Sequence, residues 1–385
     1  MSRRWTVLGI SLLGLGGVAV GVGWAFEPRQ AAHASLAALV WGASTALGAL
    51  FWVMLGVTAR TSWFVLVRRM GEGLVASLPL LALAFIPILL SLEELYPWVP
   101  GSGEMPPHVE HAVHAKRAFL NVPFYYGREA FYWAFFVGLA TVLLAWSRAL
   151  DRRNPERWIA RMRALSAPGF FVLTLVGSFA ATDWVMTLDP AWYSTIFGSY
   201  VLIGGFVSAG GWLALTAELA HRSGKLAPYG AEHRQALGTV VFATMCAWAW
   251  FAFAQFFIIW IADVPEEIRW YLDRFHGAWK WVAVGVVVAH WALPFFLLLM
   301  KPIKRHPVAL AAIGVWLSAA HFVNMYWIVL PKLHTHQPSV HWLDAMAWIA
   351  VTGALVTGHA IWTSRVPTVP EADPRYPAAL EYEGT

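Results

Sequence analysis

Long apolar runs dominate the pattern of hydrophobic and polar positions, and charged residues are nearly absent inside them. Each run is long enough for an α-helix to cross a bilayer, which takes about 20 residues, whereas a barrel strand needs only about 9–11. Because lipid offers no water to free backbone groups, only helices or closed barrels can span it. The pattern therefore predicts an all-α, polytopic membrane protein with ten transmembrane helices. The predicted spans are Trp5–Phe26, Ala34–Thr58, Leu74–Leu92, Ala130–Trp146, Gly169–Met186, Tyr193–Leu219, Leu237–Ile261, Trp279–Met300, Val308–Leu330 and Val340–Thr363.

The composition agrees with this class, because 59% of the residues are hydrophobic and only 13% are charged. Many of the 24 Trp residues lie near span ends, as in the aromatic belts of membrane proteins. The single cysteine, Cys246, falls inside a span. One thiol excludes an intrachain disulfide and cannot alone hold an iron–sulfur cluster or a structural zinc ion. We therefore expect no catalytic residue, no metal site and no covalently bound cofactor in this chain.

The basic residues are distributed unevenly between the two sides of the predicted membrane domain. With the N-terminus inside, most of the 27 Lys and Arg residues lie in the inner segments. The densest cluster, between spans four and five, contains Arg148, Arg152, Arg153, Arg157, Arg161 and Arg163. This distribution follows the positive-inside rule and does not indicate a nucleic-acid partner. We expect a multi-pass protein with cytoplasmic N- and C-termini and lipid as its surroundings. The start, Met1–Trp5, also suits a signal peptide or twin-arginine signal, but span one exceeds an ordinary signal core, so an uncleaved first helix is favoured.

The membrane domain covers residues 1–364, and residues 365–385 form a Pro-rich, acidic, cytoplasmic tail that we expect to be irregular. The longer outer segments, 93–129, 262–277 and 331–339, are the surfaces on which partners would dock. Two outer pairs have the spacing of metal ligands, His111 with His114 and His334 with His336, but without cysteine these are weak signals. Solvated or interface histidines are the favoured interpretation.

Small residues and prolines predict how some helices pack and bend. Span six carries Gly204-Gly205 and Gly210-Gly211, which permit close backbone approach between helices. Pro79, Pro87 and Pro294 are expected to kink their helices.

A few polar residues lie at membrane depth and, because charge there is costly, should face the protein interior. They are Asp183 and Gln255 near the outer side, His290, His321 and Asn324 near the middle, and Glu218 and His359 near the inner side. Three interpretations stay open. In one, the histidines serve packing alone. In another, the whole set forms a proton path with outer, central and inner parts. In the third, His290 and His321 ligate one haem. Haem is the least favoured, because no second mid-depth histidine pair is present.

Five stretches together resemble a known family: His114–Trp133, Thr182–Tyr200, Trp250–Glu267, Pro294–Pro307 and Asn324–Pro331. The chain is similar to the F subunit of bacterial alternative complex III (ActF), which is related to the NrfD-like, polysulfide reductase membrane subunit family. The resemblance implies two four-helix bundles, helices 2–5 and 6–9, with helices 1 and 10 flanking them.

The resemblance also implies a cofactor-free membrane subunit, without redox activity of its own, in a quinol:electron-acceptor oxidoreductase of the bacterial inner membrane. Its implied partners are an iron–sulfur, molybdopterin-like subunit, c-type cytochromes and a sister NrfD-like subunit that binds quinol. We expect the chain to scaffold the outer redox subunits. Proton conduction and quinone or quinol binding are further roles, the latter with His111, His114 and Asp183 as candidates. The alternatives are a free-standing transporter or channel and a haem b quinol dehydrogenase anchor.

Overall fold

The computed structural model describes residues 2–152, 154–335 and 337–384, and in these ranges the chain forms helices and no strand. Ten of its helical segments are long and apolar enough to span a membrane, which confirms the predicted class. They are α1 (Ser2–Phe26), α2 (Pro28–Thr58), α3–α5 (Phe64–Val75, Leu78–Ala84, Ile86–Leu89), α7 (Val122–Leu150), α8 (Pro155–Trp184), α9 (Phe197–Arg222), α10 (Ala231–Ala262), α12–α13 (Trp279–Val287, Leu293–Leu299), α15 (Pro307–Val329) and α16 (Trp342–Arg365). Shorter elements are η1 (Leu92–Glu94), α6 (Pro107–Ala115), η2 (Met186–Leu188), α11 (Pro265–Phe275), η3 (Val288–Ala292), α14 (Lys301–Arg305), η4 (Leu330–Lys332) and α17 (Tyr376–Leu380).

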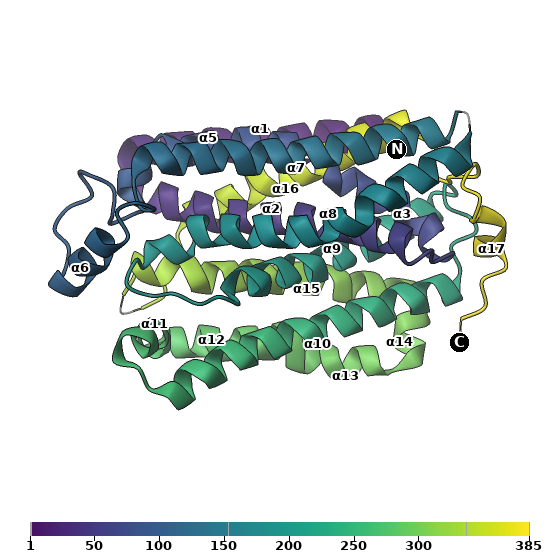
Figure 1. Ribbon diagram of the computed structural model, residues 1–385. Helices are drawn as coiled ribbons and strands as arrows, with labels where there is room; N and C mark the ends of the chain where they lie inside the picture. The colour runs from purple at the N-terminus through teal and green to yellow at the C-terminus, as the bar shows by residue number, and fades with distance from the viewer. Residues whose placement is uncertain (1, 153, 336, 385) are drawn as a thin grey trace.

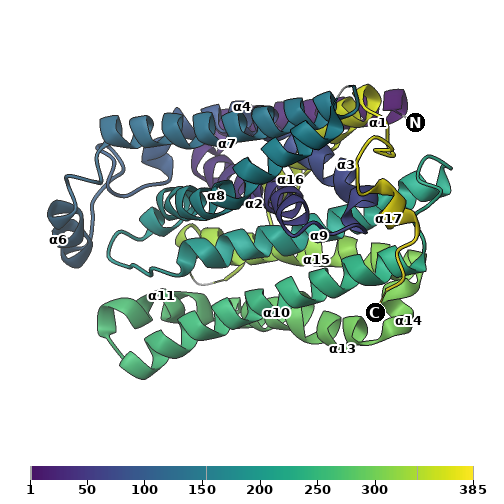
Figure 2. The ribbon, with the colours of Figure 1, turned by 45° about the vertical axis from the view of Figure 1, so that its right-hand side comes forward.

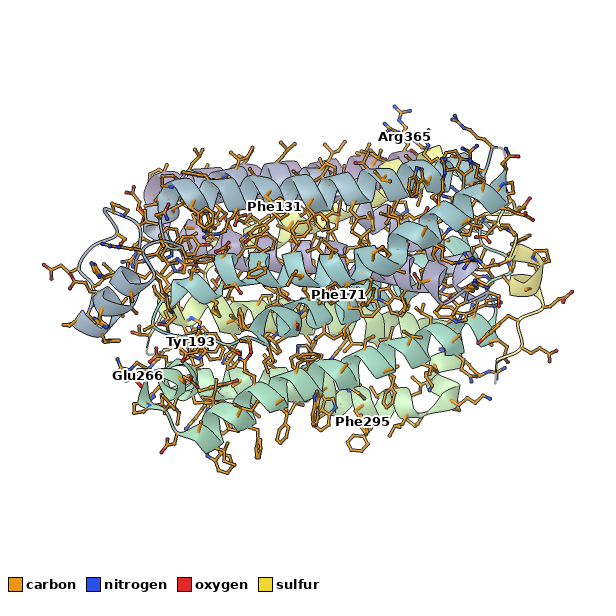
Figure 3. All side chains as sticks on the ribbon, viewed as in Figure 1. Phe131, Phe171, Tyr193, Glu266, Phe295 and Arg365 are labelled. Carbon is orange, nitrogen blue, oxygen red and sulfur yellow. The ribbon has the colours of Figure 1, made fainter. Side chains whose placement is uncertain are left out.

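The long helices lie side by side along one axis, and both chain ends reach the same end of the molecule (Figure 1). We call this end the terminal face, and the opposite end, which carries α6 and α11, the α6 face. Between the two ends the surface is apolar. Phe131 and Phe171 point outward and are 56% and 72% exposed, while the charged Glu266 and Arg365 lie at opposite ends (Figure 3). An apolar belt between polar ends is the surface that a bilayer requires.

Helix α2 lies at the centre of the fold and is buried along nearly its whole length. For reference, we call α2, α3–α4, α7 and α8 the first helical group, and α9, α10, α12–α13 and α15 the second helical group. The contacts do not separate these groups, because α2 packs more extensively on α9 than on any other helix, and α8 also contacts α9. Helix α16 packs on α2, with α1 outside it. The division into two four-helix bundles stays a prediction.

Glycines bring the helix backbones close together where the sequence suggested it. A Cβ at Gly205 would lie 2.1 Å from the Ser44 carbonyl oxygen, and one at Gly211 would lie 2.3 Å from that of Gly314. The same device holds α1 on α16, because Gly9, Gly16 and Gly23, spaced by seven, all face that helix. In lipid no hydrophobic driving force brings helices together, so close backbone packing of this kind stabilises their association.

Two transmembrane segments are broken near the prolines that predicted kinks. The third segment is interrupted twice, with Pro79 and Pro87 in the first turns of α4 and α5. In the eighth segment the π-helical turn η3 immediately precedes Pro294. Wide turns of this kind are often found at functional sites.

Several helices start earlier than the hydropathy pattern predicted. Helix α3 begins at Phe64 where the span was predicted to begin at Leu74, and α8 begins at Pro155 where Gly169 was predicted. The charged residues that mask these first turns are paired or lie at the polar end of the molecule. The tail is irregular except for α17, and it runs along the terminal face (Figure 2).

Candidate functional site

A row of polar and small residues winds along α9. Tyr200, Gly204, Ser208, Trp212 and Thr216 are spaced by four, so successive members are neighbours on the helix surface, and the row drifts round the helix by about 40° per step. Helices α2 and α15 pack on α9 along this row. We call the side chains that meet there the polar column: Tyr200, Asn324, His321, Ser44, Thr45, Ser208 and Ser318. The column has three hydrogen-bonded parts, and among the described residues no hydrogen bond between side chains joins one part to the next.

Near the α6 face, the column begins with two hydrogen bonds between helices. The Tyr200 hydroxyl donates to Asn324 Oδ1 at 2.5 Å. One turn along α15, His321 Nε2 lies 2.9 Å from Ser44 Oγ on α2. All four residues are buried, so the bonds form out of contact with water or lipid.

His290 lies beside the column on η3. Its ring stacks on His321 with 5.7 Å between centroids, and Trp248 packs edge-on against it at 3.9 Å. Among the described residues, neither ring nitrogen of His290 has a hydrogen-bond partner. Gly204 leaves space for the pair, because a Cβ there would lie 2.6 Å from His321 Cε1.

Hydroxyl groups continue the column toward the terminal face. Ser44 and Thr45 both donate to the Trp41 carbonyl, and Thr45 also lies 2.9 Å from Ser208 Oγ. Ser208 is 2.9 Å from Ser318 Oγ, which also accepts from the Trp212 indole at 3.0 Å.

Trp212 leads to a cavity of about 200 Å³, which we call the terminal cavity. Its polar walls include Thr216, His359 and Thr363. His359 also contacts the backbone at Gly73, where a Cβ would lie 2.4 Å from the ring. Glu218, the other predicted inner residue, does not line this cavity. It pairs instead with Arg222 at 2.9 Å and with Arg234 at 3.2 Å.

Asp183, a candidate for both proton transfer and quinone binding, belongs to a buried cluster of the first helical group. Arg128 donates two hydrogen bonds to its carboxylate, at 2.7 and 2.9 Å, and the Tyr132 hydroxyl donates a third at 2.8 Å. Nearby, Glu129 Oε2 accepts from the Trp184 indole at 2.8 Å. Within the described part of the chain, Glu129 Oε1 has no hydrogen-bond partner. Sequence reasoning missed Arg128 and Glu129, because both precede the predicted start of their span.

Gln255 lies at one end of a large pocket between α10, α11 and α12. Its amide donates to the Tyr271 hydroxyl at 3.3 Å and accepts from Ser194 at 3.4 Å. The pocket, which we call the lateral pocket, has a volume of about 670 Å³ and aromatic walls, including Trp248 and Trp291. Burial raises the pKa of the Tyr271 hydroxyl, so it stays protonated at neutral pH.

The other outer candidates lie apart from these sites. His111 and His114 are exposed on α6, which projects beyond the helices (Figure 1). Within the described residues, no hydrogen bond joins either of them to Asp183, or Asp183 to Gln255. His334 Nε2 donates to Gln30 Oε1 at 2.9 Å. Its predicted partner His336 lies outside the described residues.

The geometry does not favour haem on His290 and His321. Their rings lie nearly parallel, at 19°, and present faces rather than nitrogens to each other, while Trp248 fills the space beside His290. A porphyrin between two axial ligands requires both nitrogens to point at one iron. The described residues also contain no group of three or more side chains suited to holding a metal ion.

A second buried polar site, near the terminal face, was not predicted. Glu72 accepts from Arg69 at 2.8 Å and from Ser147 at 2.5 Å, and it pairs with Arg68 at 3.2 Å. Arg69 also pairs with Asp151, and Arg68 pairs with Asp373 of the tail. No protein-family model and no curated protein matches the chain, so the family resemblance rests on the sequence stretches alone.

Proposed function

We propose that the chain is a membrane subunit of a bacterial quinol:electron-acceptor oxidoreductase of the alternative complex III type, and that it conducts protons along the polar column. The resemblance of five stretches supports membership in the complex. The α6 face would contact the iron–sulfur and cytochrome partners, and the basic terminal face would lie in the cytoplasm.

The polar column is the observation that carries the proton role. From Tyr200 to Thr216 an α-helix rises about 24 Å, which is most of the roughly 30 Å hydrocarbon core. Buried polar groups are expensive in lipid, and this series of them lies along one axis at the junction of three helices.

The column contains groups that can both give and receive a proton. A neutral imidazole has one N–H donor and one acceptor nitrogen, and each hydroxyl can play both roles. The Trp212 indole is a donor only, so it orients Ser318 and does not relay a proton. Transfer between the separate parts of the column, and onward to His359, therefore requires water. For the step to His359 the terminal cavity of about 200 Å³ is large enough to hold water.

Membership is tested by purifying the tagged chain from its native membrane. We expect it to carry partner subunits with c-type haem and iron–sulfur absorption, all of which dissociate when the complex is split. A monodisperse, active protein without such partners would instead identify a free-standing transporter or channel. A Soret band that remains with the isolated chain and is lost in His290→Ala would identify a haem anchor.

The lateral pocket supports quinone binding as a second role. Aromatic walls suit a flat ring, and the Gln255 amide and the Tyr271 hydroxyl at one end suit its carbonyl groups. We expect Ala283→Trp, which fills the pocket, to abolish binding of decylubiquinone by the purified protein. Val315→Trp, at an exposed position on α15, is the matched control. Equal binding by both variants would rule the pocket out.

A further inference from the structure

The C-terminal segment, residues 366–384, lies along the terminal face and contacts both helical groups (Figure 2). Arg375 donates to the Gly56 carbonyl of α2 at 2.9 Å. Further along, the Ala379 carbonyl lies 2.8 Å from His233 Nε2 on α10. The segment therefore bridges α2 and α10, which belong to different helical groups.

A buried ion pair anchors the middle of the segment. The Asp373 side chain is fully enclosed and binds Arg68, which is itself buried and paired with Glu72. Burial alone would raise the pKa of Asp373, but the charges of Arg68 and Arg375 outweigh it and lower the pKa to about 2. Asp373 is therefore charged at neutral pH. Removing its charge would leave Arg68 with a smaller set of partners in a buried site.

The start of the segment also forms a wall of the terminal cavity. Thr368 lines the cavity together with Thr216, His359 and Thr363. The ion-paired residue of this stretch nearest to Thr368 is Asp373, five residues further along.

We propose that residues 366–384 form a clasp that joins the two helical groups and closes the terminal cavity from the aqueous side. Release of the clasp would open a water path to His359 and Thr216. Control of proton entry by the clasp rests on the proposed function, whereas closure of the cavity does not.

Access of a water-soluble reagent to the cavity tests the clasp directly. In a Cys246→Ser background, which removes the single native thiol, Thr216→Cys places a thiol in the cavity wall. The purified protein in lipid nanodiscs is treated with a charged methanethiosulfonate reagent, which does not cross lipid. We expect Asp373→Asn to raise the labelling rate by about tenfold or more, because a buried anchor is lost. Glu371→Gln, which changes an exposed carboxylate of the same segment, should leave the rate unchanged.

A second variant tests the clasp even if Asp373→Asn does not fold. His233→Leu removes the contact with Ala379 at the far end of the segment and should also raise the rate, by less. Deletion of residues 366–385 should give the fastest labelling, and an added peptide of residues 366–384 should slow it again. If well-folded Asp373→Asn and the deletion both label at the parent rate, the clasp does not exist. Labelling requires no proton transport, so this outcome is independent of whether the polar column conducts.

Discussion

His321 Nε2 on α15 lies 2.9 Å from Ser44 Oγ on α2, and this contact joins the two helical groups at the depth where His321 stacks on His290. Ser44 also donates to the Trp41 carbonyl, so the imidazole is positioned to donate to the hydroxyl oxygen. Gly205 allows the contact, because its backbone lies directly against Ser44. A close helix crossing thus places a titratable ring within the polar column.

Close glycine contacts should be sensitive to a single methyl group. In Gly211→Ala the new Cβ would lie 2.3 Å from the Gly314 carbonyl oxygen, so we expect a loss of about 1–3 kcal/mol in unfolding free energy. Gly285→Ala is the matched control, because no atom lies within 4 Å of a Cβ there. It should be neutral or stabilising by up to about 1 kcal/mol. Thermal unfolding in detergent measures both, and equal midpoints would contradict the packing described for α9 and α15.

Arg128 and Asp183 should contribute to the free energy of unfolding as a coupled pair. Arg128→Leu leaves a buried carboxylate without its main partner, and we expect a loss of about 3–5 kcal/mol. The double variant Arg128→Leu/Asp183→Leu should recover part of that loss, because it removes both charges. Arg117→Leu, at an exposed position, controls for loss of a positive charge. Asp183→Leu alone completes the set. If unfolding midpoints show that the losses of Arg128→Leu and Asp183→Leu simply add in the double variant, the residues are not coupled.

The clasp should hold over the neutral pH range. The pKa of Asp373 in the folded protein, about 2, lies below the ordinary aspartate value of about 3.9, so its charge stabilises the folded state fully above about pH 4. This stabilisation is lost only as the pH falls from about 4 toward 2. Hydrogen-exchange protection of residues 366–384, corrected for intrinsic rates, should therefore be constant between about pH 5 and 8. A decrease within that range would mean that another group anchors the segment.

The sequence was sufficient to predict the ten spans, because hydropathy is a local property. Each apolar run indicates a membrane span without reference to the rest of the chain. It was not sufficient for the buried charges, because their partners are distant in the chain. Arg68 pairs with Asp373, 305 residues away, and without that partner the stretch before Leu74 resembles a basic loop. His290 and His321 were predicted from depth alone, and the structure places them together.

The hydroxyl part of the column was missed for a different reason. Ser208 and Ser318 are small and lie in apolar runs, so neither changes the hydropathy of its span. The recurrence of Tyr200, Gly204, Ser208, Trp212 and Thr216 at intervals of four was the available signal. The spacing on α9 alone does not show which helices pack against these residues, so it could not predict their hydrogen-bond partners.

Proton translocation by the reconstituted complex tests the central claim most directly. The proton-to-electron ratio is measured in vesicles during quinol oxidation for the parent, for His321→Leu/Ser318→Ala, and for Thr239→Val, which removes an exposed hydroxyl of α10 outside the column. Hydrogen bonds between transmembrane helices average about 0.6 kcal/mol, so the double variant should still fold and assemble. We predict that its ratio falls while uncoupled electron transfer and the Thr239→Val ratio stay at the parent values. An unchanged ratio in the double variant would show that the polar column does not conduct protons.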